Sequence, residues 1–222
     1  MRDVRSGVTT EDIQALRALL ERHSRLIGEY ILSSGKPSKY YFDAKRVILS
    51  PEGVLLAGRV LYPLARQLGI DAVGGLAMGA IPLALAISLR SLENERPIPT
   101  FFVRSEKKGH GTKDQISASY PLDESDIDTE SKHSPLLRPG RRLLIVDDVV
   151  TTGDSVQDAI DAVQPLGCAI AGVVALVTRP EGGGVKMALN KFPNYVTVFD
   201  CDEDGNLSVS SLFERQLAPI AS

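Results

Sequence analysis

Several features that mark other classes of protein are missing from this sequence. It has two cysteines, Cys168 and Cys201, which are far apart and form no CxxC pair, so neither a disulfide framework nor a structural zinc site is expected. The first residues, MRDVRSGVTTEDIQ, lack the apolar core of a secretion signal. The longest apolar stretch, residues 76–89, is too short to span a bilayer and contains Pro82. We therefore expect a cytoplasmic protein without a membrane segment.

An excess of positive charge is also missing. The chain has 25 lysine and arginine residues against 28 aspartate and glutamate residues, which gives a formal net charge of −3. No general basic field attracts nucleic acid or an anionic membrane, so any bound anion must be held by a local site. With 222 residues, 43% hydrophobic and 24% charged, the chain is predicted to form a single α/β domain.

Hydrophobic periodicity predicts helices and strands that alternate along most of the chain. An amphipathic helix is expected over residues 9–24, two short strands over 26–48, and a helix from Ser50 and Pro51 to Leu68. Further strands are predicted at 71–77, 97–105, 143–148, 168–179 and 195–200, with helices at 80–90, 153–166 and 210–217. This order favours a mostly parallel central sheet flanked by helices, with a small N-terminal hood at about 1–50.

One segment, residues 105–140, fits no regular element. It is polar, contains glycine and proline, and is much longer than a usual connection. Residues 104–113 are basic, whereas residues 123–130 are strongly acidic. Loops of this length in a compact domain are generally functional lids or disordered segments, so we expect a mobile loop and insert at about 104–140.

The most informative stretch is LLIVDDVVTTGDS, residues 143–155. Asp147 and Asp148 follow a buried-type strand, at the carboxyl edge where ligands gather in open parallel sheets. The TTGDS that follows enters a helix, whose first backbone N–H groups form a natural seat for phosphate, and Gly153 allows close approach of the backbone. Carboxylate acceptors beside an anion cradle fit a ribose 5-phosphate, with the acids gripping the sugar diol.

Other classes place acids after a strand as well. Nucleotide hydrolases do so to hold magnesium, but they need the motif G-x-x-x-x-G-K-[ST], which this chain does not have. Response-regulator domains carry paired acids near their start and without a following TTGDS. A purely structural surface turn would not need both acids together with a hydroxyl-rich helix start.

LLIVDDVVTTGDS resembles the phosphoribosyl pyrophosphate (PRPP) signature of type I phosphoribosyltransferases, and further segments are similar to the orotate-specific members of that family. These segments are SSGKPSKYYFDAKRVILSPEG (33–53), GLAMGAIPLA (75–84), RSEKKGHGT (104–112) and VTRPEGG (177–183). The resemblance implies the type I phosphoribosyltransferase fold, with a parallel sheet and a hood. It also implies transfer of the phosphoribosyl group from PRPP to orotate in pyrimidine synthesis, with Mg²⁺ held mainly by PRPP. A homodimer that shares loop 104–112 between subunits is expected.

The same resemblance assigns roles to individual residues. The implied catalytic residues are Lys108, His110, Asp147 and Asp148. The implied PRPP-binding residues are Met78, Gly79, Arg104, Ser105, Lys108, His110, Asp147, Asp148, Val149, Val150, Thr151, Thr152, Gly153, Asp154 and Ser155. The implied orotate-binding residues are Tyr41, Phe42, Thr151 and Arg179. No protein ligand of the metal is assigned.

Elementary chemistry supports this assignment, although two alternatives stay open. A departing pyrophosphate needs its charge neutralised, and a cation-like anomeric carbon needs a closed site without water. The chain departs from the family pattern at Gly79, Ser33 and Ser105, where relatives often carry lysine. The alternatives are a transferase for another base, which would not need Arg179, and a PRPP-binding regulatory protein without turnover.

Overall fold

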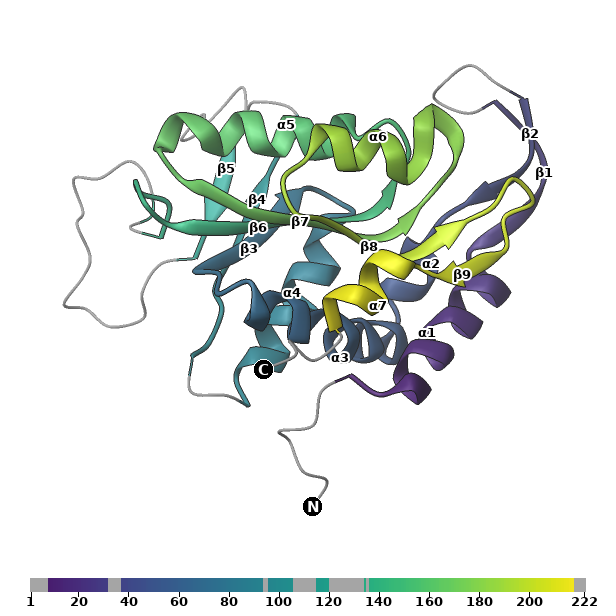
Figure 1. The fold of residues 1–222 in the computed structure, drawn as a ribbon, viewed down its shortest axis with the longest axis horizontal. Coiled ribbons are helices and arrows are strands. Elements are labelled where there is room, and N and C mark those ends of the chain that lie inside the picture. The colour runs from purple at the N-terminus through teal and green to yellow at the C-terminus, as the bar shows by residue number, and fades with distance from the viewer. Residues whose placement is uncertain are drawn as a thin grey trace.

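The structure is a computed structural model that describes residues 8–31, 37–93, 96–105, 115–119, 134 and 136–217. Its centre is a seven-stranded sheet in the order β5-β4-β3-β6-β7-β8-β9 (Figure 1). Five neighbouring strands are parallel: β3 (Ala72–Leu76), β4 (Thr100–Val103), β6 (Arg142–Val150), β7 (Ala169–Thr178) and β8 (Tyr195–Cys201). These five strands confirm the predicted mostly parallel sheet.

Two short antiparallel strands, which were not predicted, close the edges of the sheet. They are β5 (Ile116–Ala118) beside β4 and β9 (Leu207–Val209) beside β8. A strand of three residues is too short to show a periodic pattern. Strand β5 lies within residues 105–140, to which no element was assigned, and residues 106–114, 120–133 and 135 of that segment lie outside the described residues.

The N-terminal part forms a separate hairpin beside the main sheet. Helix α1 (Thr10–His23) is capped by Thr9, whose side chain accepts from the Asp12 N–H. Strands β1 (Arg25–Ile31) and β2 (Pro37–Phe42) pair antiparallel, and the four-residue helix α2 (Lys45–Ile48) follows. The Tyr40 hydroxyl donates to the Asp202 carbonyl at 3.1 Å and so attaches the hairpin to the β8–β9 turn. The expected boundaries of the hood and insert stay predictions.

Helices cover both faces of the sheet (Figure 1). On one face lie α3 (Pro51–Gln67), α4 (Ala80–Ser91) and α7 (Ser211–Leu217); on the other lie α5 (Asp154–Val163) and α6 (Gly184–Lys191). Strand β6 contributes side chains to the hydrophobic cores on both faces of the sheet, because successive side chains alternate between the faces of a strand. Leu144 and Val146 belong to the α3 and α4 core, whereas Leu143 and Ile145 belong to the α5 core.

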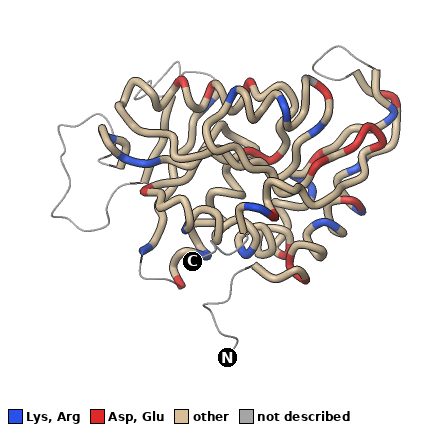
Figure 2. Tube along the Cα trace, in the orientation of Figure 1, with Lys and Arg blue, Asp and Glu red and all other residues tan. Residues whose placement is uncertain are grey.

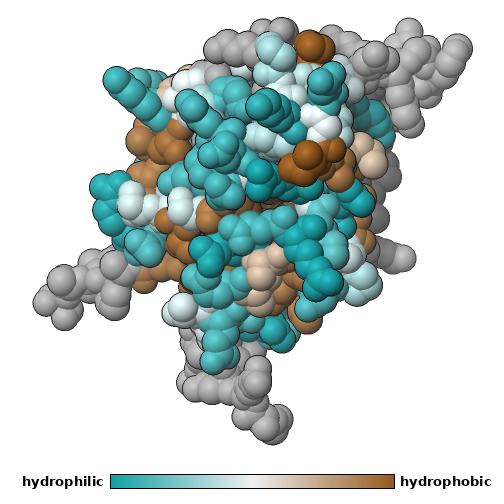
Figure 3. All heavy atoms as spheres, turned by 90° about the vertical axis from the view of Figure 1, so that its right-hand side faces the viewer, coloured by the Kyte–Doolittle hydropathy of each residue, from teal (hydrophilic) through white to brown (hydrophobic). Residues whose placement is uncertain are grey.

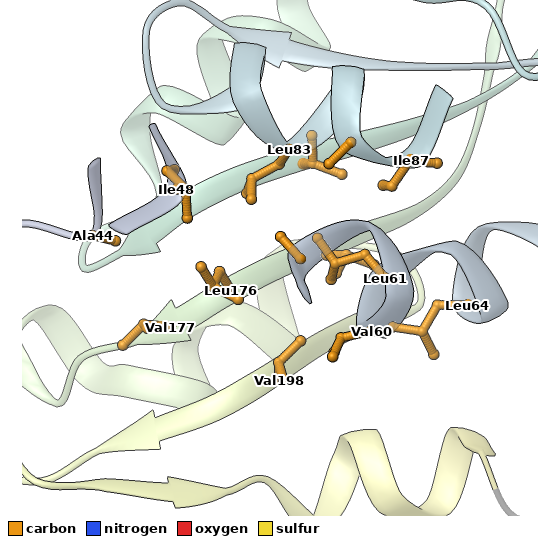
Figure 4. Packing of buried hydrophobic residues seen from close by; sticks show 14 of the residues in the cluster. Ala44, Ile48, Val60, Leu61, Leu64, Leu83, Ile87, Leu176, Val177 and Val198 are labelled. Atoms are coloured by element: carbon orange, nitrogen blue, oxygen red, sulfur yellow. The ribbon is translucent and has the colours of Figure 1, made fainter. Parts of the chain in front are cut away.

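The larger core lies between α3, α4 and the sheet. Figure 4 shows Leu61 and Leu64 of α3 and Leu83 of α4 converging on Leu176 and Val198 of strands β7 and β8. A close approach of the two helices allows this packing, since a Cβ at Gly58 would lie 2.8 Å from the Ala86 carbonyl oxygen. This rigid layer fixes the start of α4, which borders the site described below.

Strands β6 and β7 do not keep one register along their whole length. Leu143 pairs with Ile170 but Leu144 pairs with Gly172, so β7 carries one extra residue, Ala171. Such a β-bulge shifts every later residue of the strand by one position against its neighbour. From Gly172 to Thr178 the new register is maintained.

The strand order reverses between β3 and β6. The chain passes from β3 through α4 to β4 on one side, and from β6 through α5 to β7 on the other. The two helices lie on opposite faces of the sheet (Figure 1). The carboxyl ends of β3 and β6 are therefore a topological switch point, the place where open parallel sheets have a crevice. Parallel α/β sheets bind their ligands at such a switch point.

The surface is of mixed character. Figure 2 shows the positions of basic and acidic residues scattered along the described chain. The face with α1 and the hairpin shows apolar side chains among hydrophilic ones (Figure 3). Within the described residues, no helix combines the length and the apolar character that a membrane crossing requires.

Candidate active site at the ends of β3 and β6

The two neighbouring acids of the signature lie at the carboxyl end of β6, in the crevice. Asp147 and Asp148 are 8% and 6% exposed. The Asp148 backbone N–H donates to Asp147 Oδ1 at 3.0 Å, which orients the Asp147 carboxylate. The position at the switch point is the one predicted from the sequence.

A lysine from the N-terminal part contacts this pair. Lys45 Nζ lies 3.1 Å from Asp148 Oδ2 and 3.4 Å from Asp43 Oδ1. Sequence reasoning missed this residue, because α2 spans only Lys45–Ile48 and its place in space depends on the path of the hairpin. The available signal was the order FDAK, in which a cation follows the predicted hood strand.

Burial and charge change the proton affinities of these groups. Burial, followed by the negative charge of Asp148, raises the pKa of Asp147 above the usual range of a carboxyl group. Partial burial works to lower the pKa of Lys45, but the charge of Asp148, its hydrogen bond and the charge of Asp43 together outweigh burial and raise it. The lysine therefore stays charged, while Asp147 ionises at a cost.

The connection from β3 to α4 borders the same carboxylates. A Cβ at Gly79 would lie 2.2 Å from Asp148 Oδ1 and 2.9 Å from Asp147 Oδ1, so any larger residue at this position would displace the end of the Asp148 side chain. The neighbouring Met78 side chain is 67% exposed. Of the two residues assigned to PRPP here, Gly79 contributes a close backbone approach, and Met78 lies at the surface.

The glycine turn and helix start predicted after the strand, together called the cradle, are present. Val149 and Val150 end β6, Thr151 and Thr152 follow, and Gly153 precedes α5 with a φ of +78° in the left-handed region. Its missing side chain is also required by packing, because a Cβ would lie 2.7 Å from the Phe192 ring. No side chain caps α5 by a hydrogen bond, so the first N–H groups of this ten-residue helix are available to a ligand.

Two polar side chains of the cradle bind each other. The Thr152 hydroxyl donates to Asp154 Oδ2 at 2.7 Å, and Lys191 Nζ lies 3.8 Å from Asp154 Oδ1. Neither Thr152 nor Asp154 caps the helix by a side-chain bond, since the N-cap residue is Gly153. Asp154 and Ser155 are exposed. An anion at this helix start would meet chiefly backbone donors and hydroxyl groups, with the exposed Asp154 carboxylate at the outer side.

Arg179 lies at the end of β7 and is 3% exposed. Its Nε and Nη2 donate to the two carboxylate oxygens of Glu181 at 3.0 and 2.5 Å, and its guanidinium lies 4.7 Å from the centre of the Tyr40 ring. Burial works to lower the pKa of Arg179, but the hydrogen bond to Glu181 and the charge of Glu181 raise it. A carboxylate ligand of Arg179 must therefore share or replace Glu181.

The two aromatic residues assigned to the base pocket take opposite positions. Tyr41 is 41% exposed and its ring centroid lies 5.7 Å from that of Tyr30, whereas Phe42 is 3% exposed and belongs to the larger core. Neighbouring residues of a strand face opposite sides, so the structure does not bring these two rings together. Tyr41 is the one that can meet a ligand without rearrangement.

The loop residues are described only in part. The Arg104 backbone N–H donates to the Gln115 carbonyl at 2.9 Å, and its Nη2 donates to the Ser117 hydroxyl at 2.7 Å. Ser105 follows β4 and is exposed. Lys108 and His110 lie outside the described residues, and their roles stay predictions.

Known proteins share this architecture. The phosphoribosyl transferase domain family matches residues 45–204. Orotate phosphoribosyltransferase of Aquifex aeolicus (strain VF5) is 38% identical over 185 residues, which cover 82% of this chain and 92% of the relative. The crystal structure of Mycobacterium tuberculosis H37Rv orotate phosphoribosyltransferase in complex with Fe(III) dicitrate matches with a TM-score of 0.66 and 32% identity, over 85% of this chain and 96% of that chain. The structure of the same enzyme in complex with PRPP matches with a TM-score of 0.62 and 30% identity, over the same shares of both chains.

Proposed function

Because the chain belongs to the orotate phosphoribosyltransferases of the phosphoribosyltransferase family, we propose that it joins orotate to PRPP and releases pyrophosphate in pyrimidine synthesis. The observation that carries the proposal is the buried Asp147–Asp148 pair directly before the open N-terminus of α5. The acids accept hydrogen bonds from the ribose diol, and the amides and hydroxyls of residues 151–155 hold the 5-phosphate. Both substrates are small and water-soluble, and we place the reaction in the cytoplasm.

In this reaction the bond from the anomeric carbon to the diphosphate breaks, and a bond from that carbon to a ring nitrogen of orotate forms. Positive charge develops on the sugar as the diphosphate leaves. Two carboxylates held beside the sugar by burial and by the Asp148 N–H stabilise that charge. Loop residues Lys108 and His110 are proposed to act on the departing diphosphate.

Magnesium is a proposed cofactor. Among the described residues, no group of three or more histidine, cysteine or acidic side chains could hold a metal. The pair of carboxylates of Asp147 and Asp148 fits Mg²⁺, which is commonly bound by one or two carboxylates together with substrate phosphates. Asp147 and Asp148 would be the protein contacts, directly or through water, and the ion would neutralise diphosphate charge when bound.

Specificity for orotate is assigned to the end of β7. The base carries a carboxylate, and the buried Arg179 is a cation at this end of the crevice, with Tyr41 and the Thr151 hydroxyl as further contacts. Binding of orotate to Arg179 requires Glu181 to share the guanidinium or to move away. A base without a carboxylate would gain nothing from this exchange, which argues against a purine transferase.

Turnover with purified protein tests the proposed function. With PRPP and Mg²⁺ present, the ultraviolet absorbance of orotate should fall, whereas adenine should remain unchanged. Arg179→Ala should weaken orotate binding by about a hundredfold, since a charged hydrogen-bonding partner is lost, and leave PRPP affinity within about twofold. Consumption of adenine alone would point to another base, and PRPP binding without turnover would point to a regulatory protein.

We further propose a homodimer that shares loop 104–112 between its subunits. An apolar row on α4 supports the proposal: Leu85, Leu89 and Leu92 follow at spacings of four and three and are 42%, 63% and 64% exposed. Such a row on one side of a helix favours contact with another apolar surface. Sedimentation of the protein should show a dimer, and Leu89→Glu should shift it toward monomer. A monomeric protein with full activity would exclude loop sharing.

A further inference from the structure

Lys45 joins two parts of the molecule that the proposed reaction brings together. It is the first residue of α2, three positions after Phe42 at the end of β2, and it contacts Asp148 at the end of β6. Its neighbours along the chain are therefore the hood strand with Tyr41, and its neighbour in space is the acid assigned to the ribose. No role in the reaction has been assigned to Lys45 so far.

The ammonium group has capacity for a ligand. It carries three N–H donors, and two acceptors are seen around it, Asp148 Oδ2 and Asp43 Oδ1. The Lys45 side chain is 39% exposed, so its end can turn while the backbone stays in α2. A third donor is thus available to a ligand.

The neighbouring connection cannot supply a cation here. Any side chain at Gly79 would have its Cβ 2.2 Å from Asp148 Oδ1, so the β3–α4 connection approaches the carboxylates with backbone alone. Arg179 is engaged with Glu181 and lies under Tyr40. Among the described residues, Lys45 is the cation placed directly against the acid pair.

The substrate's own geometry connects these observations. In PRPP the diphosphate is attached to the anomeric carbon, which is the neighbour of the carbon that carries the 2-hydroxyl. A side chain that contacts the carboxylate gripping the diol therefore lies beside the diphosphate. A compact ammonium group on a flexible stem suits such a contact with phosphate oxygens.

We propose that Lys45 is a PRPP-binding residue that Asp148 and Asp43 hold ready and that contacts the diphosphate when the sugar occupies the crevice. The inference rests on the proposed function, because it takes the ribose site at Asp147 and Asp148 as given. In the unliganded protein, Lys45 neutralises the acid pair. In the complex, the same charge stabilises the diphosphate as it departs.

Comparison of two ligands separates this contact from a structural role. PRPP and ribose 5-phosphate share the phosphate and the diol, but only PRPP carries the diphosphate. We expect Lys45→Met to weaken PRPP binding about tenfold or more, the size of one lost charged hydrogen bond, as measured by titration calorimetry. Affinity for ribose 5-phosphate should stay within about twofold of that of the unchanged protein.

Further variants keep the test decisive. Lys45→Gln retains a donor toward Asp148 without the charge and should show the same selective loss, even if Lys45→Met fails to fold. The matched control is Arg66→Ala, which removes an exposed cation from the other end of α3, near the start of β3, and should change neither affinity.

Equal losses for both ligands in the Lys45 variants would overturn the proposal, because Lys45 would then act only by positioning Asp148. Unchanged affinity for both would overturn it as well. Failure of the unchanged protein to bind PRPP at all would instead count against the proposed function. The outcomes of the two proposals are therefore distinguishable.

Discussion

The connection from β3 to α4 and the connection from β6 to α5 end at the same crevice but are built in opposite ways. The first, with its flanking residues Leu76 and Ala80, carries no charge. The second is flanked by Asp147 and Asp148 near the end of β6 and by Asp154 at the start of α5. The acids beside the second connection explain the glycine in the first, since their oxygens lie where a Cβ of Gly79 would be. The β3–α4 connection leaves space for the carboxylates, and the β6–α5 connection is flanked by them. The space and the charge can therefore be changed by separate substitutions.

The largest effect is expected from a larger residue at Gly79, which fills the space that the Asp148 carboxylate now occupies. Gly79→Ala places a methyl group where Asp148 Oδ1 now lies, and the carboxylate must move. We expect kcat/KM for PRPP to fall about a hundredfold, as charged hydrogen bonds to the diol are lost. Because the atom that yields is the end of a side chain, the melting temperature should change little.

Gly69→Ala is the control for this change. Gly69 has a φ of +60°, and nothing lies within 4 Å of the position that a Cβ would take there, so alanine is strained without meeting the site. It should cost about 1 kcal/mol of folding stability and leave kcat/KM unchanged. If Gly79→Ala behaved in the same way, the crevice would not depend on its glycine.

An intermediate effect is expected from removing charge at Asp147. Its raised pKa means that the folded protein holds this proton more tightly than the unfolded chain, so stability falls as the pH rises from the usual carboxyl range toward the raised value. Asp147→Asn removes that cost while it can still accept from the Asp148 N–H. At slightly alkaline pH, it should raise the melting temperature by about 3 °C for about 1 kcal/mol, and should lower PRPP affinity.

Asp71 directly precedes β3, at the amino ends of the parallel strands, and provides the contrasting control. Burial works to raise its pKa, but the Arg142 N–H and the charges of Arg141 and Arg96 lower it on balance. The stability that Asp71 contributes is present above the usual carboxyl pKa and is lost as the pH falls through the lowered value. Asp71→Asn should therefore lower the melting temperature at neutral pH without affecting PRPP. Destabilisation by both variants would contradict the view that Asp147 is kept for binding alone.

The smallest effect is expected at Asp154, the acid on the outer side of the cradle. Its carboxylate accepts from the Thr152 hydroxyl and repels an incoming phosphate. Asp154→Asn should tighten the binding of ribose 5-phosphate about two- to fivefold, the size of one charge near a helix terminus. Asp158→Asn, one turn further along α5, is the control and should change the affinity less. Weaker binding by Asp154→Asn would show that this acid supports the cradle through Thr152.

The two connections also differ in how far the sequence predicted them. Asp147, Asp148 and Gly153 were assigned from a contiguous motif, because a strand, two acids and a helix start are local features. Lys45 was missed, since its contact with Asp148 spans 103 positions and depends on the hairpin path. The pairing of Arg179 with Glu181 was likewise open, although the arginine itself was assigned.

Helices and strands were predicted where the hydrophobic pattern extends over many residues. The capped helix α1, the helix from Pro51 that stops before Gly69, and the five parallel strands were all expected. The missed elements α2, α6, β5 and β9 have eight residues or fewer. Short elements are determined by tertiary contacts more than by their own pattern, as the edge strands β5 and β9 illustrate.

The extra residue in β7 has a consequence for how this lineage can vary in length. Deleting Ala171 should remove the bulge and leave Gly172 opposite Leu144, because Ile170 already pairs with Leu143, so Thr178 would stay opposite Val150 and Arg179 would keep its place. Deleting a residue between Gly172 and Thr178 would instead slide the end of the strand by one place and move the guanidinium away from the ring of Tyr40. The bulge is therefore the position at which β7 can lose one residue while the base site is retained.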